Sequence, residues 1–222
     1  MGLLILALWS GTAWWHTHKD LPPGTRIESE WREIPAGQVT FIADITAADA
    51  YGRPVMSHAI FDEVLSIVRG ARRFLVLDFF LFNDHAGSAA TAAPVRPLSS
   101  QLRDALIEQR REHPDLRVLF ITDPINDVYG GSPSPDLEAL RAAGIDVVVT
   151  DLGKLRDSNF IYSSLWRLLL AWWNPGTVGK GWLPNPFEED ARPVTFGAWA
   201  RLANFKANHR KVIIGDNGRG AL

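Results

Sequence analysis

The stretch FLVLDFFLF at residues 74–82 decides the fold class of this chain. It is nearly all apolar, as a strand buried on both faces of a sheet should be. Two similar runs follow it, LRVLFIT at 116–122 and IDVVVT at 145–150. Helical patterns alternate with these runs, at 57–69, from a capping Ser99 or Ser100 to about Glu112, and from a capping Ser134, with Pro135 in the first turn, to Gly144. Because alternation at this spacing implies right-handed crossovers, we predict an α/β fold with a largely parallel (mixed) sheet and helices on both faces.

Further elements lie on either side of this alternation. We predict short strands at 38–45 and 211–215, and a loop in the alanine-rich stretch 87–97. The segment 160–173 is long, apolar and aromatic, and a loop rich in glycine and proline follows it at 174–186.

Composition narrows the classes of protein to which this chain can belong. With 222 residues, 46% of them hydrophobic and 22% charged, it has the make-up of an ordinary globular protein. The formal net charge of −2 provides no overall basic field for non-specific binding of nucleic acid, so we do not expect a nucleic-acid partner. The absence of cysteine excludes disulfides, thiolate zinc sites and cysteine nucleophiles.

The N-terminal residues form a segment of their own. Residues 1–15 carry no charged side chain, and a tryptophan pair at 14–15 is followed by two histidines and a lysine. This order of aromatic and then basic residues is typical of the edge of a membrane segment, although the run is shorter than the roughly 20 residues needed to cross a bilayer. We expect residues 1–20 to be an apolar anchor or signal remnant; a loose or packed apolar tail is the alternative. Two prolines and a glycine then open a linker, 21–37, before the main domain, 38–222.

Polar side chains follow two of the predicted strands, at the edge where ligands bind in such sheets. Asp123 and Asn126 come after the second apolar run, and Asn159 lies beyond the third. Each is a candidate substrate contact, although turns and helix caps use the same residue types. Asp78 differs because it lies within an apolar strand, where a carboxylate is costly unless it is paired. We expect Asp78 to make a structural bond or to orient a catalytic side chain.

The most specific feature is the stretch NFKANHRKVIIGD at residues 204–216. It contains the pattern H-x-K-x-x-x-x-D as His209, Lys211 and Asp216, and strand alternation puts the histidine and the lysine on one side. This pattern resembles the HKD signature of the phospholipase D superfamily. Other parts similar to that family are Asn208 before the histidine, the apolar Val-Ile-Ile, ITDPIN at 121–126 and LRDSN at 155–159, within a resemblance that covers roughly residues 38–222.

These residue types suit the cleavage of a phosphodiester, which needs a nucleophile, a donor to the leaving oxygen and positive charge for the phosphoryl oxygens. A histidine such as His209 can serve as nucleophile or acid, and Lys211 can hold a phosphate oxygen as a point charge. Asp216, at the far end of the strand, and Asn208 are expected to shape the motif. The resemblance implies that one motif histidine forms a phosphohistidine and that its counterpart in a second motif protonates the leaving alcohol. It implies no metal and no other cofactor.

Two departures from the family pattern concern how much of the site this chain carries. The chain holds one HKD motif, whereas the family builds its site from two. The family motif also continues, six residues after the aspartate, into a Gly-Ser/Gly-x-Asn segment, and this chain stops at Leu222. We expect the chain to be the N-terminal half of a two-lobed protein, truncated at its C-terminus and inactive alone. A homodimer with one motif per chain is the alternative.

The substrate class is inferred from the family and from the aromatic segment. The superfamily includes phospholipases, cardiolipin synthases, phosphatidylserine synthases and nucleases. SLWRLLLAWW at 164–173 is either a membrane-facing segment with Arg167 near lipid phosphates or a core helix packed on the sheet. We expect a membrane-associated phosphodiesterase or phosphatidyltransferase that acts on phospholipid, with a second HKD lobe as its partner. An HKD-type nuclease and a catalytically silent membrane-associated binding module are the alternatives.

Overall fold

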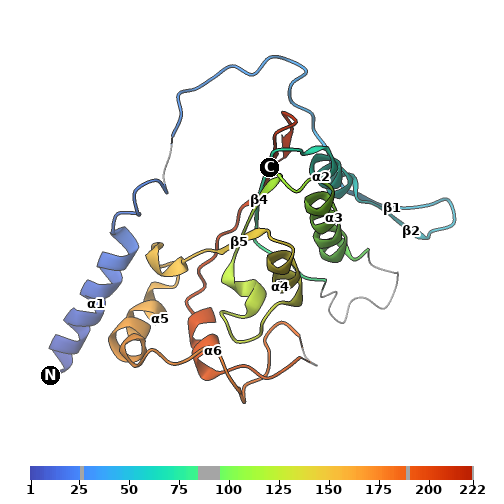
Figure 1. Ribbon diagram of the computed structural model, residues 1–222. Coiled ribbons are helices and arrows are strands. Elements are labelled where there is room, and N and C mark those ends of the chain that lie inside the picture. The colour runs from blue at the N-terminus through green and yellow to red at the C-terminus, as the bar shows by residue number, and fades with distance from the viewer. Residues whose placement is uncertain (26–27, 85–95, 189–190, 222) are drawn as a thin grey trace.

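The structure, a computed structural model, describes residues 1–25, 28–84, 96–188 and 191–221 (Figure 1). Its strands are β1 (Ile45–Ala48), β2 (Pro54–Ser57), β3 (Phe74–Phe79), β4 (Arg117–Thr122), β5 (Asp146–Val149), β6 (Lys211–Gly215) and β7 (Gly220–Ala221). Its α-helices are α1 (Gly2–His18), α2 (Ala59–Gly70), α3 (Leu98–Glu112), α4 (Pro135–Ala142), α5 (Phe160–Leu165) and α6 (Phe196–Leu202). Shorter helical segments are η2 (Pro124–Asp127), η3 (Leu152–Lys154), the π-helical η4 (Trp166–Leu170) and η5 (Ala171–Trp173). Most of the predicted loop at 87–97 lies outside the described residues.

A mixed five-stranded sheet in the order β5-β4-β3-β6-β7 forms the centre of the molecule. β3, β4 and β5 are parallel, so the predicted α/β fold with a mixed sheet is confirmed. β6 lies antiparallel to β3, with Ile213 opposite Leu77, and β7 is antiparallel to β6. This antiparallel insertion places the start of β6 beside the carboxyl end of β3.

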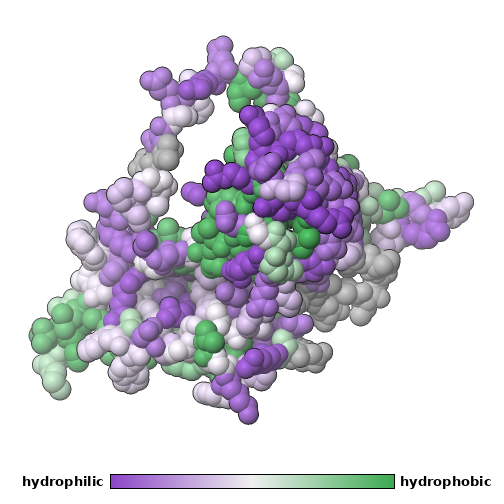
Figure 2. All heavy atoms as spheres, in the orientation of Figure 1, coloured by the Kyte–Doolittle hydropathy of each residue, from purple (hydrophilic) through white to green (hydrophobic). Residues whose placement is uncertain are grey.

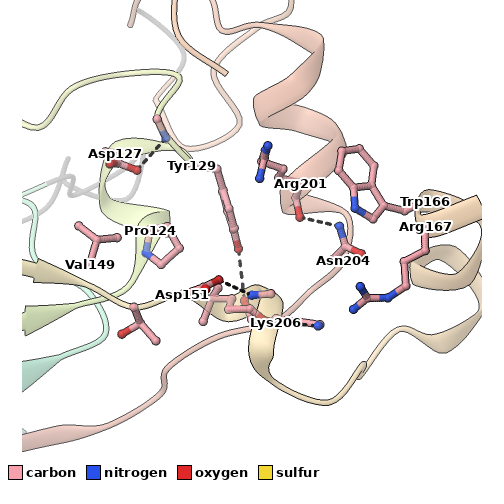
Figure 3. Close-up of a pocket in the computed structure, with 14 residues that line it drawn as sticks. Pro124, Asp127, Tyr129, Val149, Asp151, Trp166, Arg167, Arg201, Asn204 and Lys206 are labelled. Atoms are coloured by element: carbon pink, nitrogen blue, oxygen red, sulfur yellow. Dashed lines mark hydrogen bonds between the residues drawn. The ribbon is translucent and has the colours of Figure 1, made fainter. Parts of the chain in front are cut away.

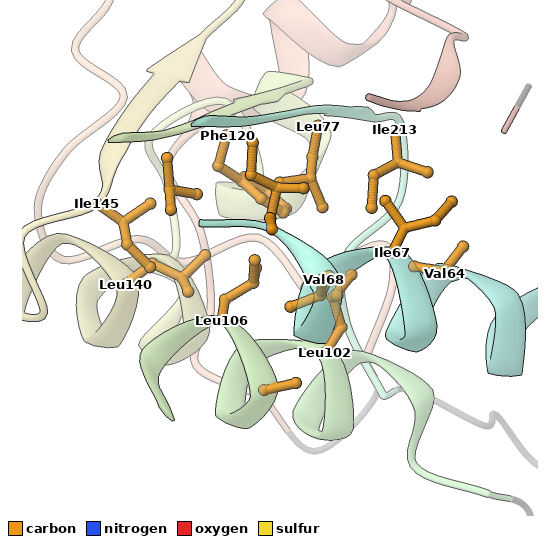
Figure 4. Close-up of a cluster of buried hydrophobic side chains, with 14 of the residues drawn as sticks. Val64, Ile67, Val68, Leu77, Leu102, Leu106, Phe120, Leu140, Ile145 and Ile213 are labelled. Atoms are coloured by element: carbon orange, nitrogen blue, oxygen red, sulfur yellow. The ribbon is translucent and has the colours of Figure 1, made fainter. Parts of the chain in front are cut away.

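Helices α2, α3 and α4 all cover the same face of this sheet. Figure 4 shows their buried side chains meeting Leu77, Phe120 and Ile213 of the strands. Both parallel crossovers step in the same direction across the sheet, and right-handed connections then put α3 and α4 on one side. The prediction of helices on both faces is therefore wrong for the described residues. On the opposite face Val148 and Ile214 remain about half exposed, at 48% and 47%.

The two crossover helices begin differently. The Ser134 hydroxyl accepts a hydrogen bond from the Leu137 N–H at the start of α4, as predicted from the Ser-Pro pair. For α3, the sequence predicts a serine cap, but the carboxylate of Asp84 accepts from the N–H groups of Ser99 and Ser100, at 2.8 and 3.0 Å. An acidic group from an earlier loop thus replaces the local cap, which sequence spacing alone does not reveal.

The predicted strand at 38–45 is also wrong. The structure instead forms a hairpin from β1 and β2, which pair antiparallel and are exposed. Its turn is fixed by Asp49, whose carboxylate accepts from the N–H groups of Tyr51 and Arg53, each at 2.9 Å. The hairpin projects away from the sheet (Figure 1), so it contributes nothing to the site described below.

The N-terminal helix α1 lies beside α5 (Figure 1). The Trp9 indole Nε1 donates to the Ile161 carbonyl at 3.3 Å, and the Asp157 N–H donates to the His16 carbonyl at 3.0 Å. Among the described helices none is long and apolar enough to cross a membrane.

The aromatic segment 160–173 is helical but divided into α5, η4 and η5. Ser163 and Ser164 of α5 are buried, whereas Trp172 and Trp173 are about three-quarters exposed, at 76% and 77%. This segment packs against α1, at the carboxyl end of the parallel strands, and contributes no side chain to the buried cluster beneath the sheet.

Candidate functional site

Asn208 connects three strand ends at the carboxyl edge of the sheet. Its backbone N–H donates to the Asp123 carboxylate at 2.6 Å, beyond β4. Its side-chain Nδ2 donates to Asp78 of β3 at 2.7 Å and to the hydroxyl of Thr150, beyond β5, at 3.1 Å. The structure thus brings Asp78, Asp123 and Asn208 together and holds the residue that immediately precedes His209.

The two carboxylates around Asn208 are buried, with 6% of Asp78 and 1% of Asp123 exposed. Burial raises the pKa of Asp123, and the hydrogen bonds from Asn208 and Ile125 lower it again in part. Arg210, the residue after His209, places its Nη1 3.7 Å from the Asp78 carboxylate. Asp78 therefore binds residues on both sides of His209, which is an orienting arrangement.

His209 and Lys211 lie next to each other at this edge and are both exposed. The Lys211 Nζ is 3.0 Å from Nδ1 and 3.2 Å from Nε2 of His209. The Lys211 ammonium also donates to the backbone carbonyl of His209 at 3.0 Å. The Phe80 ring supports both groups, with its centre 4.6 Å from the His209 ring and 5.2 Å from the Lys211 Nζ. A nucleophilic nitrogen and a cation thus stand side by side, open to solvent.

Asp216, the third residue of the motif, lies at the opposite end of β6. The five residues of that strand put it roughly 17 Å from Lys211. Its carboxylate accepts from the N–H of Arg72 at 2.8 Å and from the N–H of Arg73 at 3.1 Å. These hydrogen bonds, the one from Arg72 first, lower the pKa of Asp216 to about 2. Asp216 anchors β6 to the turn between α2 and β3 and is not brought near His209.

Two predicted substrate contacts, Asn126 and Asn159, form hydrogen bonds within the protein itself. The Asn126 amide accepts from the Phe82 N–H and donates to the Phe80 carbonyl, both at 2.8 Å, and so shapes the loop after β3. Asn159 donates to the Ala203 carbonyl at 3.0 Å. Their roles in substrate binding stay predictions.

Arg167, the remaining predicted contact, belongs to a buried ionic cluster. Its Nη2 and Nε lie 2.8 and 3.1 Å from the carboxylate of Asp157, whose side chain is fully buried. The Nζ of Lys206 is 2.6 Å from the same carboxylate and also donates to the carbonyls of Leu152 and Leu155. Burial works against the charge of Asp157, but the hydrogen bonds from Arg167 and Lys206 outweigh it and lower its pKa. This cluster connects η4 to the segment that leads into His209.

Two cavities flank the motif, and neither is lined by His209 or Lys211 themselves. The smaller, of about 370 Å³, will be called the Arg201 cavity; Figure 3 shows residues that line it, including Tyr129, Thr150, Trp166, Arg167, Arg201 and Lys206. The larger, of about 720 Å³, includes Phe80 and Asn126 in its wall. Phe80, whose ring centre lies 4.6 Å from that of His209, therefore connects the larger cavity with the motif.

Sequence reasoning missed Arg201, Lys206 and Phe80. Lys206 stands three residues before the motif histidine, and Phe80 directly follows the strand that carries Asp78. Arg201 lies on α6, a helix of seven residues. The Thr195 hydroxyl caps this helix by accepting from the Ala198 N–H at 3.2 Å, and a threonine at that position is the one sequence feature that could have indicated the helix.

At the carboxyl edge of the mixed sheet, a histidine–lysine pair thus follows Asn208, which two buried carboxylates hold. Polar groups from β3, β4, β5 and the chain before β6 converge there, as expected for a ligand-binding edge. A scan of the sequence against models of known protein families gives no match, and a search of curated proteins gives none either.

Proposed function

We propose that this chain is a phospholipase D-like phosphodiesterase or phosphatidyltransferase that acts through His209. The observation that carries the proposal is the contact between the His209 imidazole and the Lys211 ammonium, 3.0 Å apart and exposed at the carboxyl edge of the sheet. Asn208, which is bound by two buried carboxylates, fixes the backbone immediately before His209.

In this mechanism the substrate phosphate approaches the pair from solvent. Lys211 binds a non-bridging phosphoryl oxygen and offsets the negative charge that develops there. A His209 nitrogen attacks phosphorus, a nitrogen–phosphorus bond forms, and the bond from phosphorus to the headgroup oxygen breaks with its electron pair leaving on that oxygen. Water or an alcohol then attacks the phosphorus of the phosphohistidine, and the nitrogen–phosphorus bond breaks with its electron pair returning to His209. The attacking oxygen gives its proton to a base of the partner half-site, and the phosphatidyl product leaves.

The leaving headgroup oxygen needs a proton, and we propose that a second HKD half-site supplies it. Within the described residues His209 has no second histidine beside it; its ring contacts Lys211 and Phe80. One half-site can attack but lacks the acid that completes turnover. A partner lobe, in the same protein or in a second chain, is therefore part of the proposal.

Phospholipid is the proposed substrate because large apolar side chains are exposed on α1 and on the neighbouring α5–η5 segment. These side chains, here called the α1/α5 surface, are Leu3, Leu4, Ile5, Leu6, Leu8, Trp14 and Trp15, together with Phe160, Ile161, Leu165, Leu169, Trp172 and Trp173. The apolar tip of α1 is visible in Figure 2. Exposed tryptophans beside leucines are typical of surfaces that sit at a membrane interface, so we propose that this surface rests on the bilayer.

The test is turnover of phosphatidylcholine and phosphatidylglycerol vesicles by protein in which this chain is paired with a second HKD lobe. We expect His209→Ala to abolish headgroup release, while His113→Ala, at the far end of α3, leaves it unchanged. The chain alone is expected to show no repeated turnover.

Three other results contradict the proposal. Equal turnover by wild type and His209→Ala removes the catalytic role of the histidine. Cleavage of single-stranded DNA without cleavage of lipid indicates a nuclease. No cleavage of either substrate by the paired wild type indicates a silent binding module.

A further inference from the structure

The Arg201 cavity contains a cation that has no anionic partner among the described residues. The described part of the chain gives Arg201 one hydrogen bond from its Nη2, to the neutral Oδ1 of Asn174 at 2.9 Å. Its guanidinium carbon lies 6.0 Å from the centre of the Trp166 ring, and its Nε is buried with no hydrogen-bond partner among the described residues. A buried donor without a partner costs free energy, so this arrangement favours an incoming acceptor.

Three cationic side chains, Arg167, Arg201 and Lys206, line the cavity together with the carboxylates of Asp127 and Asp151. Arg167 and Lys206, which also line the cavity, share the single carboxylate of Asp157. Behind them, Lys19 has its pKa lowered by burial and by the charges of Lys206 and Arg167. The pKa of His16 is lowered in the same way, by burial and then by Arg167. Burial is the larger cause of both pKa shifts, and the charges of the neighbouring cations add to it.

The carboxylates at the cavity wall are already engaged. Asp127 accepts from the Gly130 N–H at 2.8 Å, and burial raises its pKa. Asp151 accepts from the Gly153 N–H at 3.0 Å and lies 3.8 Å from the Lys154 ammonium. Neither forms an ion pair with Arg201 in the described residues, so the charge of Arg201 stays available.

We infer that the Arg201 cavity is a binding site for a phosphate group, separate from the His209 site. Arginine presents planar N–H donors that match phosphate oxygens, and Trp166 supports its guanidinium plane. Figure 3 shows the Arg201 side chain between α6 and Tyr129, facing the space that the cavity encloses. A volume of about 370 Å³ accommodates a phosphate together with a small polar group attached to it.

This site does not depend on the proposed reaction, because neither His209 nor Lys211 lines the cavity. It lies close to the motif all the same: Thr150 in the cavity wall accepts from Asn208, and Lys206 precedes the motif. The phosphate can belong to a soluble phosphate ester or to a lipid headgroup presented by a bilayer on the α1/α5 surface. Both sources present the same phosphate group and differ in the molecule to which the phosphate is attached.

The test is calorimetric titration of the Lys211→Gln chain, in which the motif lysine cannot hold phosphate. Inorganic phosphate and glycerol phosphate probe the soluble source, and phosphatidylcholine vesicles with and without phosphatidic acid probe the lipid source. We expect saturable binding of at least one source, weakened about tenfold or more by Arg201→Gln because a charge-assisted hydrogen bond is lost. Arg111→Gln, an exposed arginine on α3 that lies 3.9 Å from Glu108, is the matched control and should bind as before.

Arg201→Lys keeps the charge and should retain part of the affinity, and its thermal unfolding checks that the fold survives. Binding of neither source, equal affinity in Arg201→Gln, or an equal loss in Arg111→Gln overturns the inference. Because every variant carries Lys211→Gln, these outcomes are distinct from a failure of the His209 proposal, which is measured by turnover.

Discussion

At the scale of single residues, Asn208 explains how an exposed histidine can have a fixed position. One amide side chain and one backbone N–H bind groups from β3, from beyond β4 and from beyond β5. Hydrogen bonds to ionised groups are stronger than neutral ones, and two of these three acceptors are buried carboxylates. The histidine that follows is therefore carried by a rigid point of the fold rather than by a loose loop.

Asp216 stabilises the fold rather than the reaction, and its pKa of about 2 makes this testable. The pKa is lower in the folded chain than the roughly 3.9 of an unfolded one, so its contribution is complete above about pH 4 and is lost as the pH falls towards 2. We expect Asp216→Asn to lower the melting temperature at pH 7 and to flatten its dependence on pH between 4 and 2. Thermal unfolding followed by circular dichroism measures this.

Asp115→Asn, an exposed aspartate before β4, is the control and should leave the melting profile unchanged. An Asp216→Asn profile that falls with acid as steeply as wild type would show that the hydrogen bonds from Arg72 and Arg73 do not stabilise the fold.

Residues of the site differ in how well sequence could predict them. The spacing of His209 and Lys211 predicts two side chains on one side of a strand, and the structure places them 3.0 Å apart. Arg201 contacts Asn174 and Lys206 contacts Asp157, and each partner lies far away in the sequence. No local sequence pattern therefore predicts these contacts. The burial of Asp78 within an apolar run was visible, but its partner Asn208 was not.

At the scale of elements, apolar runs and helix caps predict which helices and strands form, but not always how these elements are arranged in space. β3, β4, β5 and β6 and helices α2, α3 and α4 lie where their patterns indicate. Sequence spacing gave no sign that β6 runs antiparallel to β3, because strand direction depends on the path of the preceding chain. The short elements α6 and β7 were not predicted, since seven and two residues carry little periodic signal.

The Asp157 cluster joins two of these elements, and its loss should loosen both. Asp157→Asn leaves Arg167 and Lys206 without their buried counter-charge, so we expect the free energy of unfolding to fall by roughly 3–5 kcal/mol. Urea denaturation measures the change. Asp104→Asn removes a carboxylate from an exposed pair with Arg103 and should cost less than about 1 kcal/mol. Equal effects of the two substitutions would contradict a structural role for the buried cluster.

At the scale of the whole molecule, the fold is a mixed sheet covered by three helices on one face, with the candidate site at one edge (Figure 1). The fold class could be predicted because alternation of strands and helices fixes it. The face of the sheet that the helices cover could not be predicted, because it depends on the order of the strands. Two crossovers in the same direction place their helices on the same face.

The α1/α5 surface belongs to this scale because it joins segments from the two halves of the chain. We expect Trp172→Ala combined with Trp173→Ala to weaken binding to vesicles containing anionic lipid by roughly tenfold or more, because two large aromatic side chains no longer enter the interface. Sedimentation with vesicles measures the bound fraction. Trp31→Ala is the matched control, since Trp31 is fully exposed but lies in the linker. Equal loss in the control, or none in the double variant, contradicts the proposed surface.

The central claim is that His209 attacks a phosphodiester, and a substrate with a good leaving group tests it without a partner lobe. In bis(4-nitrophenyl) phosphate the leaving nitrophenolate is stable without a proton, so one half-site suffices for the first step. We expect the chain to release about one equivalent of nitrophenolate and to carry the remaining phosphoryl group on His209, located by peptide mass spectrometry. His209→Asn should give neither product, and His113→Ala should give both. No adduct on wild type, or an equal adduct on His209→Asn, would contradict the account.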